Sequence, residues 1–187
     1  MTFIIMGFLA FVFFYIFDFN KVYHFHKYIN ISFGVGVVLL AVATLGLLFS
    51  ASKSFAIYFP LRVLFGLLSI LFLLLIPYTL FFALPFKKTY IETENKNMVV
   101  DRGMYALCRH PGVLWFSFFY FFAWLAMGKM LVMWAGIVWT IMDIIHVYVQ
   151  DLWLFPKALA GYREYQRKVP FLIPNFRSLK QFMMTIK

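Results

Sequence analysis

The stretch VLFGLLSILFLLLIPYTLFFALPF, residues 63–86, contains no Asp, Glu, Lys or Arg. A helix that spans a bilayer needs about 20 mostly apolar residues, so this stretch predicts a transmembrane helix. Similar uncharged stretches cover residues 1–17, 28–52 and 110–128, and another, 130–150, is interrupted only by Asp143 and His146. The sequence therefore predicts an all-α integral membrane protein with about five spanning helices, near 2–18, 31–51, 62–85, 111–128 and 130–150.

Composition supports this class. The chain has 187 residues, of which 64% are hydrophobic and only 13% are charged. Soluble globular domains are about one quarter charged, so this composition is typical of membrane proteins. The length suits a single membrane domain over residues 1–187.

Basic residues predict the orientation. Under the five-helix prediction, fourteen Lys and Arg residues fall in the first loop, the third loop and the C-terminal tail, and three fall on the other side. Basic residues are enriched on the cytoplasmic side, so we expect the tail in the cytoplasm and the N-terminus outside. The net charge of +10 then reflects topology and anionic lipid head groups, and no nucleic-acid partner is expected.

Two halves differ in their polar content. Residues 1–86 form three apolar segments, which we interpret as a three-helix scaffold with a kink at Pro77. Residues 87–187 hold the long polar connection and the basic tail, so this half is expected to carry the chemistry. His24 and His26 have no Cys or carboxylate neighbours, and no metal site is predicted. Cys108 is expected to be a small buried hydrophobic residue.

The first candidate site lies where the fourth predicted helix begins. Arg109 and His110 precede Pro111, which is well tolerated in the first turn of a helix. Free backbone N–H groups at a helix start favour a carboxylate or phosphate, and Arg109 would add a cation. The alternative is that Arg109 and His110 only anchor this helix at the lipid head groups.

The second candidate site lies on the fifth predicted helix. Asp143, His146 and Gln150 share one face, and Asp151 adjoins them. Ionisable residues within a span usually face a protein interior or a watery cavity. They predict either a polar wall for a ligand that enters from the cytoplasm or an Asp143–His146 pair that locks helices together.

Two segments resemble a known family. GMYALCRHPGVLW (103–115) resembles the G-x-Y-x-x-x-R-H-P-x-Y-x-G motif of isoprenylcysteine carboxyl methyltransferases and related phospholipid methyltransferases. HVYVQDLWLFPKALAGYREYQRKVPFLIP (146–174) resembles their R-x-x-x-E-E-x-x-L motif with the Y-x-x-Y, V-P and final Pro that follow. The sequence departs from these motifs at Val113, Trp115, His146 and Gln150-Asp151.

The resemblance implies an enzyme that uses S-adenosyl-L-methionine at the cytoplasmic ends of the last two helices, under the C-terminal tail. A lipophilic small molecule or lipid would be the acceptor and would enter from the bilayer. Arg109, His146 and Asp151 would be catalytic. The residues expected to bind the cofactor are Asn97, Met98, Val99, Val100, Tyr105, His110, Pro111, Gly112, Val113 and Gln150.

The departures affect the expected acceptor. His146 stands where the family has an Arg, and a histidine is at most partly cationic at pH 7. An acceptor carboxylate would be held poorly, so an amine, a thiol or a lipid head group is preferred. Two alternatives stay open: a reductase that uses a nicotinamide dinucleotide, as in the similar membrane sterol reductases, and a non-catalytic membrane protein.

Overall fold

Long apolar helices dominate the computed structural model, which describes residues 1–51, 54–82 and 97–185. They are α1 (Thr2–Tyr23), α2 (Ile31–Phe49), α3 (Phe59–Pro77), α6 (Pro111–Met127) and α7 (Met130–Val149). With their helical continuations, four segments are long and apolar enough to cross a membrane: Thr2–Tyr23, Lys27–Phe49, Phe59–Phe81 and Met130–Ala158. The helix α6 is also apolar but has only 17 residues. Over these described ranges the fold is thus all-α apart from one pair of very short strands, and the four long apolar segments suit a multi-pass membrane protein.

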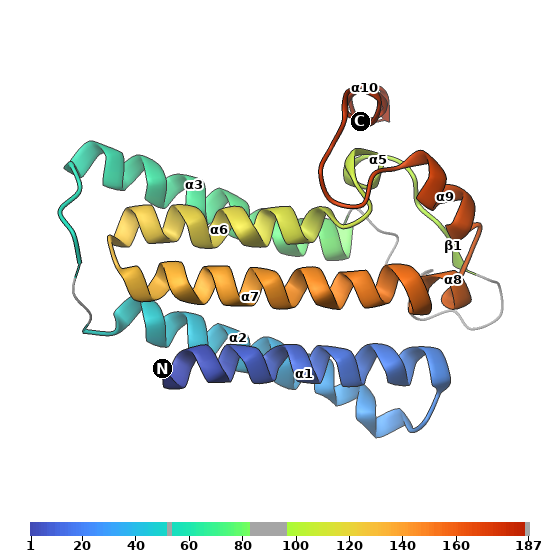
Figure 1. Cartoon of the computed structure of the whole chain (residues 1–187), viewed down its shortest axis with the longest axis horizontal. Coiled ribbons are helices and arrows are strands. Elements are labelled where there is room, and N and C mark those ends of the chain that lie inside the picture. The colour runs from blue at the N-terminus through green and yellow to red at the C-terminus, as the bar shows by residue number, and fades with distance from the viewer. Residues whose placement is uncertain (52–53, 83–96, 186–187) are drawn as a thin grey trace.

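The short elements of the described residues gather at one end of the long helices, which we call the polar end (Figure 1). They are η1 (Lys27–Asn30), η2 (Tyr78–Phe82), η3 (Gln150–Leu154), β1 (Asn97–Met98), β2 (Leu159–Ala160), α5 (Met104–Leu107), α8 (Phe155–Ala158), α9 (Tyr162–Lys168) and α10 (Phe176–Thr185). The N-terminus lies at the opposite end (Figure 1), where α2 ends and Lys129 donates to the backbone oxygens of Leu48 and Ser50.

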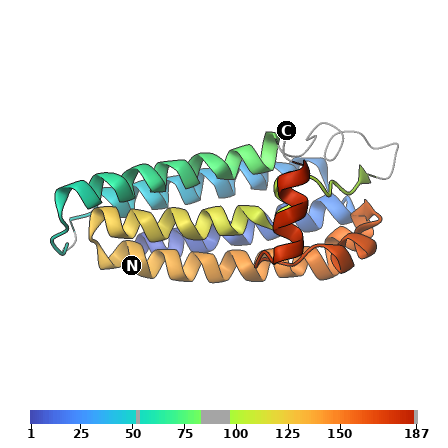
Figure 2. The ribbon, with the colours of Figure 1, turned by 90° about the horizontal axis from the view of Figure 1, so that it is seen from above.

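The long helices run along a common direction (Figures 1 and 2), and successive contacts join α3 to α6, α6 to α7, α7 to α1 and α1 to α2. Helix α3 packs mainly on α6, and α1 packs on both α2 and α7. The segments 1–86 and 87–187 are therefore interleaved in space, because α3 of the first segment is the partner of α6 of the second.

The outward faces of the helices are apolar. Leu67, Leu71 and Leu74 of α3 are each at least half exposed, and the only buried residue of this helix is Ser69. Ser69 donates a hydrogen bond to the backbone oxygen of Phe119 at 3.2 Å. Exposed apolar surface on this scale is unusual for a soluble monomer and suits contact with lipid.

Helix boundaries differ from the sequence prediction at the polar end. The first helix was expected to end near residue 18, but α1 continues to Tyr23 and ends at His24, which has a left-handed conformation with φ 54°. The side chain of Asn20 closes this end by hydrogen bonding to the backbone of His26 and to Asn30. The polar residues that follow the apolar run thus belong to the helix and are not a loop. Residues 83–85 of the third predicted span lie outside the described residues.

At Pro77 the chain changes from an α-helix to a π-helix. It lies at the end of α3, and the π-helical segment η2 follows it directly. A proline inside a helix removes one backbone hydrogen bond, which explains why the regular α pattern stops here.

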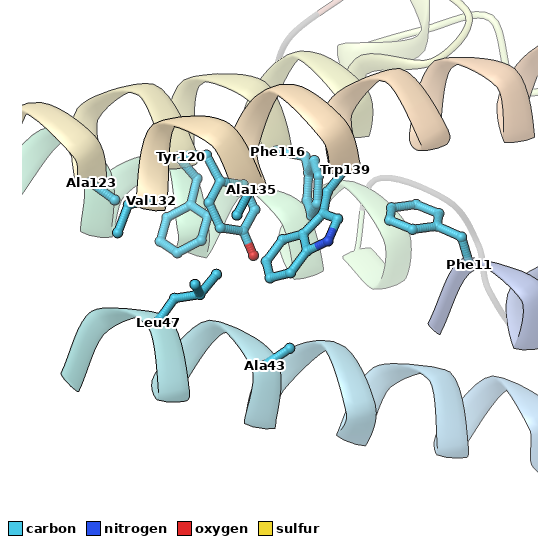
Figure 3. Packing of buried hydrophobic residues seen from close by; sticks show 10 residues of the cluster. Phe11, Ala43, Leu47, Phe116, Tyr120, Ala123, Val132, Ala135 and Trp139 are labelled. Atoms are coloured by element: carbon cyan, nitrogen blue, oxygen red, sulfur yellow. The ribbon is translucent and has the colours of Figure 1, made fainter. Parts of the chain in front are cut away.

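Trp139 of α7 is the centre of the buried core (Figure 3). Its side chain is fully buried, and its Nε1 donates a hydrogen bond to the backbone oxygen of Ile4 at 3.0 Å. Tyr120 packs against the indole ring, and its hydroxyl lies 2.6 Å from that of Thr44. These two polar tips bind α7 to α1 and α6 to α2 within an otherwise apolar core.

Gly7 makes the close approach of α1 and Trp139 possible. A methyl group added at Gly7 would overlap the Trp139 indole, whereas one added at Gly34 of α2 would meet nothing within 4 Å. We expect Gly7→Ala to destabilise the protein by about 1–3 kcal/mol, since overpacked cores cost this much. Thermal unfolding in detergent checks this, with Gly34→Ala as the matched control. Equal midpoints for the two variants would contradict the packing described.

Candidate functional site

The carboxylate of Asp151 is the centre of a buried polar network at the polar end. Its Oδ1 accepts a hydrogen bond from the Tyr162 hydroxyl at 2.7 Å and lies 3.3 Å from Nε2 of His110. Its Oδ2 accepts from Nε2 of Gln166 at 3.1 Å. Only 5% of the Asp151 side chain is exposed, so these donors replace water as its partners.

Arg109 neutralises this carboxylate. Its Nε lies 3.0 Å from Oδ1 of Asp151 but is not directed at it, so the contact is an ion pair without an aligned hydrogen bond. Its Nη1 donates to the backbone oxygen of Gln166 at 2.7 Å, and its guanidinium lies over the ring of Phe171. These contacts direct Arg109 into the protein.

His110 is held in its neutral form. Burial lowers the pKa of His110, and the nearby Arg109 and His146 lower it further, although Asp151 opposes them. Because Nε2 faces a carboxylate, it carries the proton of the neutral ring. Phe155 stacks on the imidazole, and Phe171 meets it edge-on. His110 is therefore a hydrogen-bond donor at the base of α6.

The backbone also joins the two sequence motifs. The N–H of Arg109 donates to the oxygen of Pro170 at 2.9 Å, and the N–H of His110 donates to that of Phe171 at 3.3 Å. The backbone at Pro170 and Phe171, which begins with the proline of the second motif's V-P pair, thus binds the Arg109-His110 pair of the first motif.

Pro156 explains why Asp151 and Gln166 meet. In the π-helical segment η3 the N–H of Phe155 donates to the oxygen of Gln150, a spacing of five residues. The same spacing would pair Asp151 with Pro156, which has no N–H to donate. Gln166 supplies the missing donor, because its Nε2 donates to the Asp151 backbone oxygen at 2.8 Å.

The Tyr162-x-x-Tyr165 pair connects α9 to α5 and to the segment that contains β1. Tyr165 donates its hydroxyl to the backbone oxygen of Tyr105 at 2.7 Å. Burial raises the pKa of both tyrosines, so both remain donors near neutral pH. Val99 packs on these tyrosines, and the neighbouring strand β1 pairs in parallel with β2. Residues 97–100 are thereby placed beside α9.

Thr79 connects η2 to this region. Its backbone oxygen accepts from the Tyr105 hydroxyl at 3.2 Å, and its hydroxyl accepts from Nε1 of Trp115 at 3.0 Å. The indole of Trp115 also stacks on Phe72. These contacts accommodate a large side chain where the resembled motif has a glycine.

A second polar cluster lies on the other side of η3. Oδ2 of Asp18 is 2.7 Å from Nε2 of His146 and accepts from Nε2 of Gln150 at 2.6 Å. Tyr15 packs edge-on against His146 at a ring distance of 4.7 Å. The partner of His146 is thus Asp18 of α1, rather than Asp143 as one sequence interpretation proposed.

The predicted site residues therefore divide between two clusters. Arg109, His110 and Asp151 meet directly, whereas His146 and Gln150 turn toward Asp18. Pro111 and Val113 are buried in the first turn of α6, and Tyr105 contacts η2. Gly112 follows Pro111 in the same turn, and a methyl group added to it would meet nothing within 4 Å. Asn97 and Met98 form β1.

Three polar residues of this region were missed in the sequence: Asp18, Thr79 and Gln166. A signal existed for Asp18, because it is the only acidic residue before Glu92 and lies at the end of an apolar run.

Two cavities lie near these clusters. One, of about 220 Å³, is lined by Asp101, Ala106, Lys168, Val169, Arg177, Ser178 and Gln181. The other, of about 330 Å³, is an apolar groove on the α1 side lined by Val12, Tyr15, Ile16, Phe19, Phe25 and Ile29. Tyr15 belongs both to this groove and to the surroundings of His146.

Among the residues that the structure describes, no group of three or more His, Cys, Asp or Glu side chains could hold a metal ion. No protein-family model, curated protein or solved structure matches the chain.

Breaking the Arg109–Asp151 pair should show that the network is coupled. We expect Asp151→Leu to cost about 3–5 kcal/mol, since it leaves a buried cation without its partner. Arg109→Met/Asp151→Leu should be more stable than Asp151→Leu alone, because no charge is then left behind. Thermal unfolding of the two single variants and the double variant measures the coupling.

Glu164→Gln provides the control, since Glu164 pairs with Lys168 on the exposed surface. Its unfolding midpoint should stay near that of the wild type. Strictly additive effects of the Arg109 and Asp151 substitutions would contradict the contact.

Cys108 should resist thiol reagents in the folded protein. Its side chain is fully buried, and burial raises its pKa to about 12, so almost no reactive thiolate exists at pH 8. Maleimide labelling followed by mass spectrometry should give no adduct until the protein is unfolded in detergent. A Glu164→Cys variant should take up one label in the native state; rapid native labelling of the wild type would contradict the burial.

Proposed function

We propose that this chain is a multi-pass membrane methyltransferase that uses S-adenosyl-L-methionine and acts on a lipophilic or membrane-associated acceptor. The active site would lie at the polar end, on the cytoplasmic side of the membrane. The observation that carries this proposal is the buried network around Asp151. Residues from two motifs that are about 40 positions apart in the sequence, and that both resemble one methyltransferase family, meet in it.

The cavity of about 220 Å³ suits the amino-acid end of the cofactor. Arg177 supplies positive charge for a carboxylate, and Asp101 supplies negative charge for an ammonium group; Lys168 also lines the cavity but is paired with Glu164. A zwitterion needs both signs close together, and this cavity provides them. Ala106 and Val169 connect its wall to the segments that hold Tyr105 and Arg109.

Arg109 is then assigned a positioning role. Its Nε lies beside Asp151 and its Nη1 donates to the backbone oxygen of Gln166, so Arg177 is better placed to take the carboxylate that the sequence had suggested for Arg109. Arg109 instead fixes Asp151 and, through Gln166, holds α9 against η3.

The second cluster suits the acceptor side. When bound, the cofactor supplies a sulfonium methyl group, and the acceptor's lone pair displaces the sulfur from it. The Asp18–His146 pair can take the proton that the acceptor loses, since Nε2 of His146 is already hydrogen-bonded to a carboxylate. The apolar groove reaches this pair at Tyr15 and would hold the acceptor's tail.

A non-catalytic membrane protein is the second candidate. Arg109, His110, Tyr162 and Gln166 satisfy one another and Asp151, and such a network can hold segments together without any ligand. Cofactor binding distinguishes the two candidates.

Calorimetric titration with S-adenosylhomocysteine should detect binding to the detergent-purified protein. Arg177→Gln should weaken binding by removing a cation from the cavity. Loss of one charge-assisted hydrogen bond costs about 1.5–3 kcal/mol, roughly a 10- to 150-fold rise in Kd. Lys180→Gln is the matched control, because it removes a charge from the same helix but not from the cavity wall.

Absence of binding to a folded sample would reject the methyltransferase proposal. A parallel titration with a nicotinamide dinucleotide then separates the reductase alternative from a protein without either cofactor.

A further inference from the structure

Helix α10 leaves most of its apolar side chains exposed. Phe176 is 85% exposed, Met183 61% and Met184 63%. The side that faces the protein carries the buried Ser178 and the half-buried Phe182 and Thr185, whereas Arg177 and Gln181 line the cavity and remain exposed. This is the reverse of a helix that packs on a soluble core, which buries its apolar stripe.

The helix is built to hold this orientation. The N–H of Ser178 donates to Oδ1 of Asn175, and the N–H of Asn175 donates to the Ser178 hydroxyl, so the first turn is capped in both directions. At the other end the N–H of Gly103 donates to the Thr185 hydroxyl at 3.0 Å. Both ends are thus fixed, and the apolar side cannot turn inward.

The placement of α10 relates it to the membrane. It runs crosswise to the long helices and lies beside the bundle, at the level where α6 begins (Figures 1 and 2). If the long helices cross a bilayer, a crosswise helix at this level lies in the plane of the interface between head groups and acyl chains.

We propose that α10 is an interfacial helix that inserts its apolar side into the cytoplasmic surface of an anionic membrane. The side chains that enter the interface are those of Phe176, Leu179, Met183 and Met184. This proposal rests on the membrane insertion of the bundle and on the orientation that the basic residues predict, and it is independent of the proposed methyl transfer.

Charge supports an anionic lipid surface as the partner. Lys180 is exposed within the apolar side, where its long aliphatic stem can lie along the acyl boundary while its ammonium group reaches the phosphates. Arg163 and Arg167 of α9 are also exposed. Short amphipathic helices bind membranes by this combination of buried apolar area and basic side chains.

A nitroxide label at Met183→Cys in the full-length protein tests the insertion. The protein is placed in nanodiscs of phosphatidylcholine with phosphatidylglycerol, and collisions with oxygen and with a water-soluble nickel chelate are measured by electron paramagnetic resonance. We expect the Met183 label to be accessible to oxygen and shielded from nickel. A label at Glu164→Cys on exposed α9 should be accessible to nickel, and Cys108 stays unlabelled in both.

The lipid dependence forms the second arm. In the Lys180→Gln background the nickel shielding at residue 183 should decrease, and it should decrease for wild-type α10 in pure phosphatidylcholine as well. Nickel access at residue 183 equal to that at residue 164 in anionic discs would overturn the proposal. Dipolar broadening between labels, with shielding that persists without lipid, would instead identify a second copy of the chain as the partner and would equally overturn it.

Discussion

A carboxylate almost out of contact with water needs a donor on every side, and Asp151 draws its donors from separate segments. His110 comes from the start of α6, and Tyr162 and Gln166 come from α9, while Arg109 adds a positive charge beside Oδ1. If any of these were absent, a buried charge or polar group would lose its partner, which costs more than the contact itself contributes. The polar end can therefore adopt this arrangement only as a unit.

Prolines determine where this unit forms. Pro77 and Pro156 each lie beside a π-helical segment in an otherwise regular span, and each segment presents polar groups that a regular helix would use internally. At η2 these groups bind Tyr105 and Trp115; at η3 they bind Gln166. Such π segments are frequent at functional sites, because the widened turn directs neighbouring side chains to different sides. Gln150 and Asp151 show this directly, since adjacent residues belong to different clusters.

The sequence predicted the long helices well, because a lipid environment requires long apolar runs and leaves few alternatives. It predicted the helix ends less well. Helix α1 continues past Asn20, and η3 continues α7, through polar residues that the sequence alone would assign to loops. The meeting of Arg109, His110 and Asp151 could be anticipated from the paired motifs.

The roles of Asp18 and Gln166 could not be anticipated in the same way. Asp18 binds His146 and Gln150 across the contact between α1 and α7, and hydropathy does not show which helices are neighbours. Gln166 replaces the N–H that Pro156 lacks, and this N–H would be needed by Asp151 only because the helix is a π-helix at this point. The cofactor assignment remains a prediction from resemblance.

The length of α6 has a consequence for the surrounding bilayer. Its 17 residues rise about 26 Å, whereas the hydrocarbon layer is about 30 Å thick. Phe118 and Phe121 are exposed on this helix, so lipid reaches it directly. If α6 crosses a bilayer together with the other long helices, the acyl chains beside it shorten or splay to match it, and head groups with their water approach Arg109 and His110. Hydrophobic mismatch of this kind favours thinner bilayers, so membrane thickness would help to decide in which compartment the protein resides.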